Sequence, residues 1–371
     1  MASPEIVDIS GLLQPVSEDN PAGTDIREDS SPTSPYYTIK DARNAARAAE
    51  RNSMFDGGSP EADENWRKII ELAPDILKNH AKDLEVACWY SEALIRRYGF
   101  QGLRDGFSLI RQLIEQYWDN LFPMPDEDGI ETRVAPLTGL NGEGAEGVLI
   151  APIRNVDITE GSSIGPFNFW QYQQALDVQK IMDEEQRAAK IDKLGFSLED
   201  IERAVAESAD IFYLDLRDDI QHAIDEYRKA SRMLDERCGT HDAPPTSNII
   251  STLENSLGAV KHLGKHKLPS ETENAEDAEN GAATDSQAGG ASGAPATVKG
   301  PVQSRTDAFK QLREISEFFR KTEPHSPISY ILAKAVKWGE MSLNELIMEL
   351  IPDSSSRDYY SSLTGVKTED E

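Results

Sequence analysis

The sequence contains a serine with the spacing of a hydrolase nucleophile. Gly161-Ser162-Ser163-Ile164-Gly165 fits the G-x-S-x-G pattern, with Ser163 in the central position. In hydrolases this pattern lies on a sharp turn between a strand and a helix, which exposes the serine hydroxyl group. Here a polar loop precedes it and Pro166 follows directly. These surroundings argue against a nucleophilic Ser163.

A second segment has the spacing of a dinucleotide-binding loop. Residues 142–147, Gly-Glu-Gly-Ala-Glu-Gly, fit G-x-G-x-x-G. No convincing strand precedes them, and Glu143 and Glu146 would place negative charge beside a pyrophosphate. We interpret these glycines as turn residues and expect no cofactor.

Four potential zinc ligands occur as two pairs, Cys238 with His241 and His262 with His266. His262 and His266 are four residues apart and would share one helical face. The order of ligands matches no common structural zinc site, and two prolines separate the pairs. We therefore expect no metal site. A hydrolase or metal-dependent enzyme that uses Ser163 or these four residues is the alternative function.

Apolar residues recur at three- and four-residue steps along most of the chain, which predicts an all-α fold. One such face includes Trp66, Ile69 and Ala73, and another runs from Phe107 to Trp118 and ends before Pro123. Ser197 precedes a third apolar run, where its hydroxyl can cap a helix. The segment 137–142 is interpreted as a loop.

The composition predicts four regions. We expect an N-terminal helical domain with an extended N-terminal arm (1–160), a middle helical domain (161–268), an acidic linker rich in Gly, Ser and Ala (269–303) and a C-terminal helical domain (304–365). The linker has almost no apolar side chains larger than Ala, so burial cannot offset the entropy of ordering it, and it is expected to be disordered. The C-terminal domain is small for an independent core, so its apolar helices are expected to pack against other copies.

Charge and cysteine content exclude several functions. The formal net charge is −28, with 66 acidic and 38 basic residues, so the surface repels nucleic acid. Two cysteines in so long a chain do not suggest a disulfide framework. We see neither a signal peptide nor a membrane span, and expect a cytoplasmic protein that is not inserted into a membrane.

The segment between Trp66 and Asn155 contains WRKIIELAPDIL, AKDLEVACWYSEALIRRYGFQGLRDGF, LIRQLIEQYWDNLFPMPDEDG and ETRVAPLTGLNGEGAEGVLIAPIRN. Together these stretches resemble the N-terminal domain of the TssA/ImpA family of the type VI secretion system. The later stretch FRKTEPHSPISYILAKAVKWGEMSLNELIMELI is similar to a C-terminal domain found in many members. The order of domains is also similar.

The resemblance implies a scaffold without enzymatic activity. In the family, C-terminal domains assemble into rings, and N-terminal domains contact baseplate subunits, the contractile sheath, the Hcp tube and, in some members, the membrane complex. The expected partners are therefore further copies of this chain and these components. The predicted oligomer interface comprises Pro324, Ser326, Pro327, Ile331, Trp338 and Leu346. The candidate signature or partner surface of the N-terminal domain comprises Arg104, Asp105, Asn141, Glu143 and Arg154. An internal ion pair that fixes a corner between helices is the alternative role of Arg104 and Asp105.

Overall fold

The computed structural model describes residues 2–52, 59–127, 129–161, 163–239, 241–269, 305–322 and 328–341, with residues 346 and 349. Within these ranges the chain is helical, and β pairing is limited to isolated bridges. The prediction of an all-α fold is confirmed. The chain divides into two compact units, Met1–Ala283 and Thr284–Glu371, and each is described by itself.

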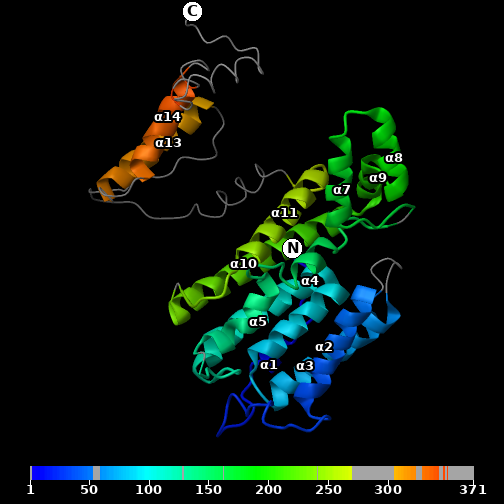
Figure 1. Ribbon diagram of the computed structural model, residues 1–371, viewed down its shortest axis with the longest axis vertical. Coiled ribbons are helices and arrows are strands. Elements are labelled where there is room, and N and C mark those ends of the chain that lie inside the picture. The colour runs from blue at the N-terminus through cyan, green and yellow to red at the C-terminus, as the bar shows by residue number, and fades with distance from the viewer. Residues whose placement is uncertain are drawn as a thin grey trace, which may run out of the picture. The chain divides into compact units, whose positions relative to one another are not determined.

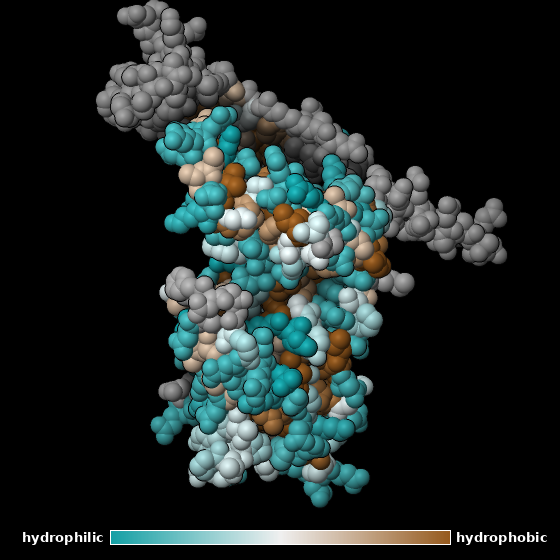
Figure 2. Space-filling view, turned by 90° about the vertical axis from the view of Figure 1, so that its right-hand side faces the viewer, coloured by the Kyte–Doolittle hydropathy of each residue, from teal (hydrophilic) through white to brown (hydrophobic). Residues whose placement is uncertain are grey.

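Unit 1 is a helical body built around one long helix (Figure 1). Its elements are α1 (Ile9–Leu12), α2 (Pro35–Asn52), α3 (Pro60–Asn79), α4 (Leu84–Tyr117), η1 (Trp118–Asn120), α5 (Glu131–Asn141), α6 (Ile150–Arg154), α7 (Phe169–Gln179), α8 (Glu184–Leu194), α9 (Leu198–Glu207), α10 (Asp210–Cys238) and α11 (Ser247–Leu263). Helices α2 and α3 lie beside α4, and α10 lies along α4 with α11 packed against it. Figure 2 shows a face on which hydrophilic residues predominate and hydrophobic residues form separate strips.

Helix α4 contains a sharp kink at Gly99, where φ is 59° and ψ is −141°. This region of backbone conformation is essentially restricted to glycine. A Cβ atom at this position would also come within 3.1 Å of a methyl group of Val156. The kink divides α4 into a first half that contacts α2 and α3 and a second half that contacts α10.

Local capping explains where several helices begin. Asp83 caps α4 by accepting a hydrogen bond from the Val86 amide. Ser197 caps α9 and forms a reciprocal capping box with Asp200, which confirms the predicted helix start. Such caps satisfy amide groups that have no partner inside the helix.

A fully buried lysine connects the N-terminal arm with the helical core. The Nζ atom of Lys82 donates hydrogen bonds of 2.6 Å to the carbonyl groups of Leu12 and Leu77. These carbonyls lie at the ends of α1 and α3, where helices leave acceptors unsatisfied. Burial lowers the pKa of Lys82 from 10.5 to about 8.

Residues 1–160 and 161–268, expected to be separate domains, lie in the same compact unit. The reason is the packing of α10 along α4, where the buried rings of Phe107 and Tyr227 stack with centroids 4.4 Å apart. That the two segments are separate domains stays a prediction.

The interpretation of residues 137–142 as a loop was wrong, since α5 continues to Asn141. Buried Val134, Leu137 and Leu140 recur every three residues and hold this helix to the core.

Unit 2 contains two described helices, α13 (Arg305–Thr322) and α14 (Ile328–Glu340), which pack against each other. The buried Ser316 hydroxyl donates a 2.7 Å hydrogen bond to the Ser329 carbonyl. Val336 is buried as well. Among the described residues of both units, no helix combines the length and apolar character needed to cross a membrane.

Candidate functional site

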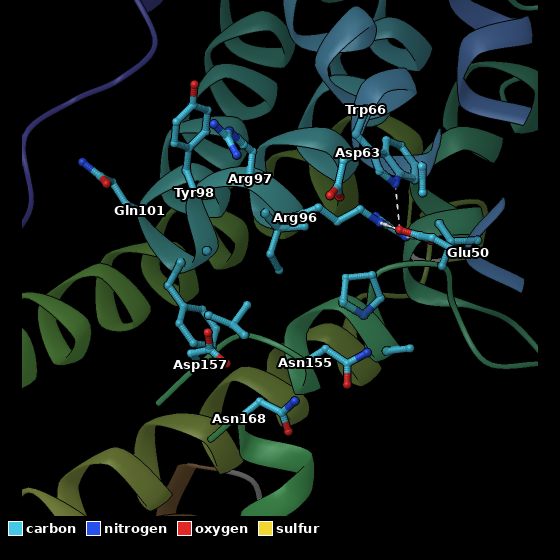
Figure 3. Close-up of a pocket in the computed structure, with 18 of the residues that line it drawn as sticks. Glu50, Asp63, Trp66, Arg96, Arg97, Tyr98, Gln101, Asn155, Asp157 and Asn168 are labelled. Atoms are coloured by element: carbon cyan, nitrogen blue, oxygen red, sulfur yellow. Dashed lines mark hydrogen bonds and ion pairs between the residues drawn. The ribbon is translucent and has the colours of Figure 1, made fainter. Parts of the chain in front are cut away.

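A cleft of about 1410 Å³ opens beside the kink of α4. One wall comes from α2, α3 and the first half of α4, and the other from the segment 146–157, the start of α7 and α10. Figure 3 shows Arg96, Arg97 and Tyr98 on one side of the gap and Asn155, Asp157 and Asn168 on the other. The positive φ of Gly99 ends the first half of α4 and thereby places these side chains at the cleft.

Arg96 is held rigidly at the end of this wall. Its guanidinium group donates hydrogen bonds to Glu50, the shorter of which is 2.6 Å, and lies 4.0 Å from the centre of the Trp66 ring. The Trp66 indole N–H donates to the same carboxylate at 2.7 Å (Figure 3). Glu50 therefore neutralises Arg96 and fixes its orientation.

Three further arginines line this wall, namely Arg47 and Arg51 from α2 and Arg97 from α4. Sequence reasoning missed them. The available signal was the four-residue spacing of Arg43, Arg47 and Arg51, which places them on one face of a helix.

The opposite wall carries amide and carboxylate side chains. Asn168 caps α7 with its side-chain oxygen, which accepts from the Gln171 amide at 2.9 Å. Asp157 remains solvent-exposed, but the surrounding protein desolvates its carboxyl group enough to raise its pKa.

A buried polar clamp lies at the second half of α4. Arg104 contacts the neighbouring Asp105 at 2.7 Å and Asp219 of α10 at 2.6 Å. Arg104 also donates to the carbonyl groups of Ser3 and Pro4, at 2.6 and 3.0 Å. The clamp thus ties the N-terminal arm, α4 and α10 together.

Arg104 and Asp105 therefore form an internal ion pair, which was the alternative to a partner surface. Both side chains are buried, and Asp105 accepts hydrogen bonds from the amides of Ile6 and Val7. In this structure they are not available to a partner, so the placement of these two residues at a partner surface is corrected.

Asn141 is also buried and has a role inside the fold. Its side-chain oxygen accepts a 3.0 Å hydrogen bond from the Ile249 amide, in the first turn of α11. The N-cap of α11, Thr246, makes no side-chain capping bond. Asn141 thus supplies from α5 the acceptor that this helix start requires, which is a structural role and not a place on a partner surface.

The two remaining candidates of this group are more accessible. Glu143 is exposed on the turn after α5. Arg154 pairs with Glu146 at 2.8 Å and lies 5.8 Å from the centre of the exposed Trp170 ring. The structure does not bring the five candidate residues together in one surface.

The enzymatic alternative has no support in the geometry of its candidate residues. The Ser163 hydroxyl donates a 2.6 Å hydrogen bond to Glu207 in an exposed loop. The described residues of the motif lie in this loop and not on a turn between a strand and a helix. Gly142 and Gly144 have φ angles of 83° and 68°, as expected for turn glycines.

The four residues considered as potential zinc ligands do not meet. Among the described residues there is no group of three or more histidine, cysteine or acidic side chains able to hold a metal ion. Cys238 ends α10, whereas His262 and His266 lie at the end of α11, where Gly264 contacts Tyr213 near the start of α10. Tyr213 and Cys238 are 25 residues apart along α10, about 38 Å at 1.5 Å per residue, so the two pairs lie at opposite ends of a helical hairpin.

The predicted oligomer interface is only partly described. Pro324, Ser326 and Pro327 lie outside the described residues. Ile331 is exposed, whereas Trp338 and Leu346 are half-buried. Four further apolar side chains of α13 and α14 are exposed and are not among the six predicted interface residues, namely Ile315, Phe318, Ile328 and Tyr330.

Comparison with known proteins agrees with this architecture. The family described as "ImpA, N-terminal, type VI secretion system" matches residues 13–142. The chain is 26% identical over 372 aligned residues to the type VI secretion system component TssA1 of Pseudomonas aeruginosa, covering 98% of this chain and all of that protein. This chain belongs to the TssA/ImpA family.

A solved structure shares the fold of most of this chain. It is the N-terminal domain, including the conserved ImpA_N region, of the TssA component from Burkholderia cenocepacia. The match has a TM-score of 0.57 and 24% identity, and covers 71% of this chain and 96% of that one. The shared fold therefore extends well beyond the segment 13–142, in agreement with the continuous packing of α4 and α10.

Proposed function

We propose that this TssA/ImpA protein is a non-enzymatic structural scaffold of the type VI secretion system. Unit 2 assembles copies of the chain into a ring, and unit 1 binds other components, namely baseplate subunits, the sheath, the Hcp tube and, in some systems, the membrane complex. The protein acts in the cytoplasm and supports assembly of the contractile tail. Membership of the family and the similarity to TssA1 along its whole length support this assignment.

The observation that carries the ring proposal is the exposed apolar surface of α13 and α14. Phe318 is 60% exposed, Tyr330 67% and Ile331 62%, and Ile315 and Ile328 add to the same pair of helices. Removal of apolar surface from water contributes about 25 cal/mol per Å². So many large apolar side chains on so small a unit favour association with a matching surface. Another copy of unit 2 offers that surface.

Oligomerisation raises the overall binding strength of contacts that are individually weak. A ring presents many copies of unit 1 to an assembly that is itself repetitive. When several of them bind at once, the avidity exceeds the affinity of one site by about 10² to 10⁴ if the spacing is compatible. Tubes, sheaths and baseplates are built from repeated subunits, so they offer repeated binding sites to a multivalent scaffold.

Light scattering on two fragments tests the proposal. A fragment that ends at Pro269 is expected to be a folded monomer or small oligomer, whereas residues 302–371 are expected to form large oligomers alone. A monodisperse monomer from residues 302–371 would refute the ring.

A pair of substitutions in the full chain adds a control. Phe318→Glu introduces a charge into the apolar surface and is expected to reduce the oligomer size. Lys321→Glu adds a carboxylate at the exposed end of the same helix without removing an apolar side chain, and is expected to leave the size unchanged.

A further inference from the structure

The α2–α4 wall of the cleft carries three arginines that pair with no acidic side chain of the described residues. Arg47, Arg51 and Arg97 line the cleft, and within the described part of the chain no hydrogen bond or ion pair joins any of them to an acidic side chain. Their neighbours differ, since Arg43 pairs with Glu92 at 2.5 Å and Arg96 with Glu50 at 2.6 Å. The three unpaired groups are therefore a distinct feature of this wall.

Of the three unpaired groups, Arg47 lies closest to other cationic side chains. Burial lowers the pKa of Arg47, and the positive charges of Arg43, Arg96 and Arg51 act in the same direction, while Glu92 opposes them. Like charges placed this close repel, and a bound anionic group would relieve that repulsion.

Helix dipoles account for part of this charge but not all of it. Arg51 lies in the last turn of α2, and Arg97 lies just before the kink that ends the first half of α4. Each helix end carries a partial charge of about −0.5. The two ends and the carboxylate of Asp63, which also lines the cleft, together offset about two of the three positive charges. The wall stays positive on a chain whose net charge is −28.

The opposite wall is suited to a polypeptide backbone. Asn155 and Asn168 face the gap in Figure 3, and the amide N–H groups of such side chains donate to peptide carbonyl groups. Asp157 and Asp215 also line this side. Charges of opposite sign are thus separated across the cleft, so a bound chain would be oriented by its own charges.

We propose that this cleft binds an extended peptide segment of a protein partner, with acidic side chains of that segment placed against Arg47, Arg51 and Arg97. The cleft volume of about 1410 Å³ exceeds the range of about 300 to 1,000 Å³ that is typical of small-molecule sites. The acidic surface elsewhere repels such a segment, so the local reversal of sign directs it to this wall. The inference deepens the scaffold function by giving unit 1 a docking site, and it rests on that function.

Fluorescence anisotropy with the full-length protein tests the docking site. The probe is a labelled peptide of Glu and Ala, compared with matched peptides of Gln and Ala and of Lys and Ala. We expect the Glu peptide to bind most tightly. Arg47→Gln/Arg51→Gln/Arg97→Gln should weaken its binding about tenfold, because exposed ion pairs each contribute little but act together.

The matched control removes the same charge elsewhere. Arg203, Arg232 and Arg237 are exposed residues of α9 and α10 that do not line the cleft. Their triple substitution by Gln should change Glu-peptide binding by less than about twofold, since long-range charge effects are screened by salt. Arg97→Gln alone, at an exposed side chain, provides the test if the triple variant fails to fold.

Three outcomes would overturn the proposal. These are tighter binding of the Lys peptide, equal losses from the cleft and control variants, and equally effective competition by single-stranded nucleic acid, which would indicate a general anion site. The light-scattering test of unit 2 is independent of all three. A failed docking site is therefore distinguishable from a failed ring.

Discussion

Arg104 of α4 and Asp219 of α10 form a buried ion pair of 2.6 Å, although 115 residues separate them in the sequence. The same guanidinium group holds Asp105 and the carbonyl groups of Ser3 and Pro4. One side chain therefore joins the N-terminal arm to both long helices of unit 1.

Removal of this arginine is expected to destabilise unit 1 strongly. Arg104→Ala leaves the carboxylates of Asp105 and Asp219 buried without their cation, and loss of one partner from a buried pair costs about 3 to 5 kcal/mol. The free energy of unfolding, measured by urea denaturation, is the readout. The control is Arg228→Ala, which breaks an exposed pair with Glu254 and should cost less than about 1 kcal/mol. Similar small losses in both variants would contradict the role assigned to the clamp.

Lys82 is expected to give unit 1 a characteristic pH dependence. Burial lowers its pKa in the folded state from 10.5 to about 8, so between these values the unfolded state binds more protons. The contribution of this group to stability therefore rises with pH through this window. Cys88 and several buried tyrosines have raised pKa values and act in the opposite direction at high pH. A comparison with Lys82→Met isolates the lysine.

Urea denaturation of both proteins at pH 7.5 and 9.5 makes this comparison. The wild type should gain about 2 kcal/mol relative to Lys82→Met between the two values. A stability difference that does not change with pH would show that the lysine titrates normally.

The kink at Gly99 is expected to tolerate no side chain. Gly99→Ala forces a Cβ atom into a backbone conformation with φ of 59° and to within 3.1 Å of Val156, which should cost about 1 to 3 kcal/mol. Gly139→Ala, inside α5 with open space around the added atom, should be neutral or slightly stabilising. Thermal unfolding measures both. An unchanged melting temperature for Gly99→Ala would show that α4 can continue through this position.

Local features of the fold could be predicted from the sequence, whereas long-range contacts could not. The all-α class follows from apolar periodicity, and the cap at Ser197 depends only on residues within one helical turn. The contact of Arg104 with Asp219 depends on how α10 packs along α4, which no local pattern specifies. For the same reason Asn141, assigned to a surface, is a buried acceptor for α11.

The candidate site illustrates the same division. The spacing of Arg43, Arg47 and Arg51 predicts a shared helical face. Which of the three is paired depends on another helix, because Glu92 of α4 forms an ion pair with Arg43. The position of Arg97 at the cleft depends on the Gly99 kink. Only the folded chain separates the paired arginines from the unpaired ones.

Electron microscopy of the purified full-length protein tests the ring proposal most directly. We expect closed rings of uniform size, and we expect Phe318→Glu to disperse them into smaller particles. Uniform single-chain particles for the wild type at high micromolar concentration would contradict the proposal that the exposed apolar surface of α13 and α14 assembles copies of this chain.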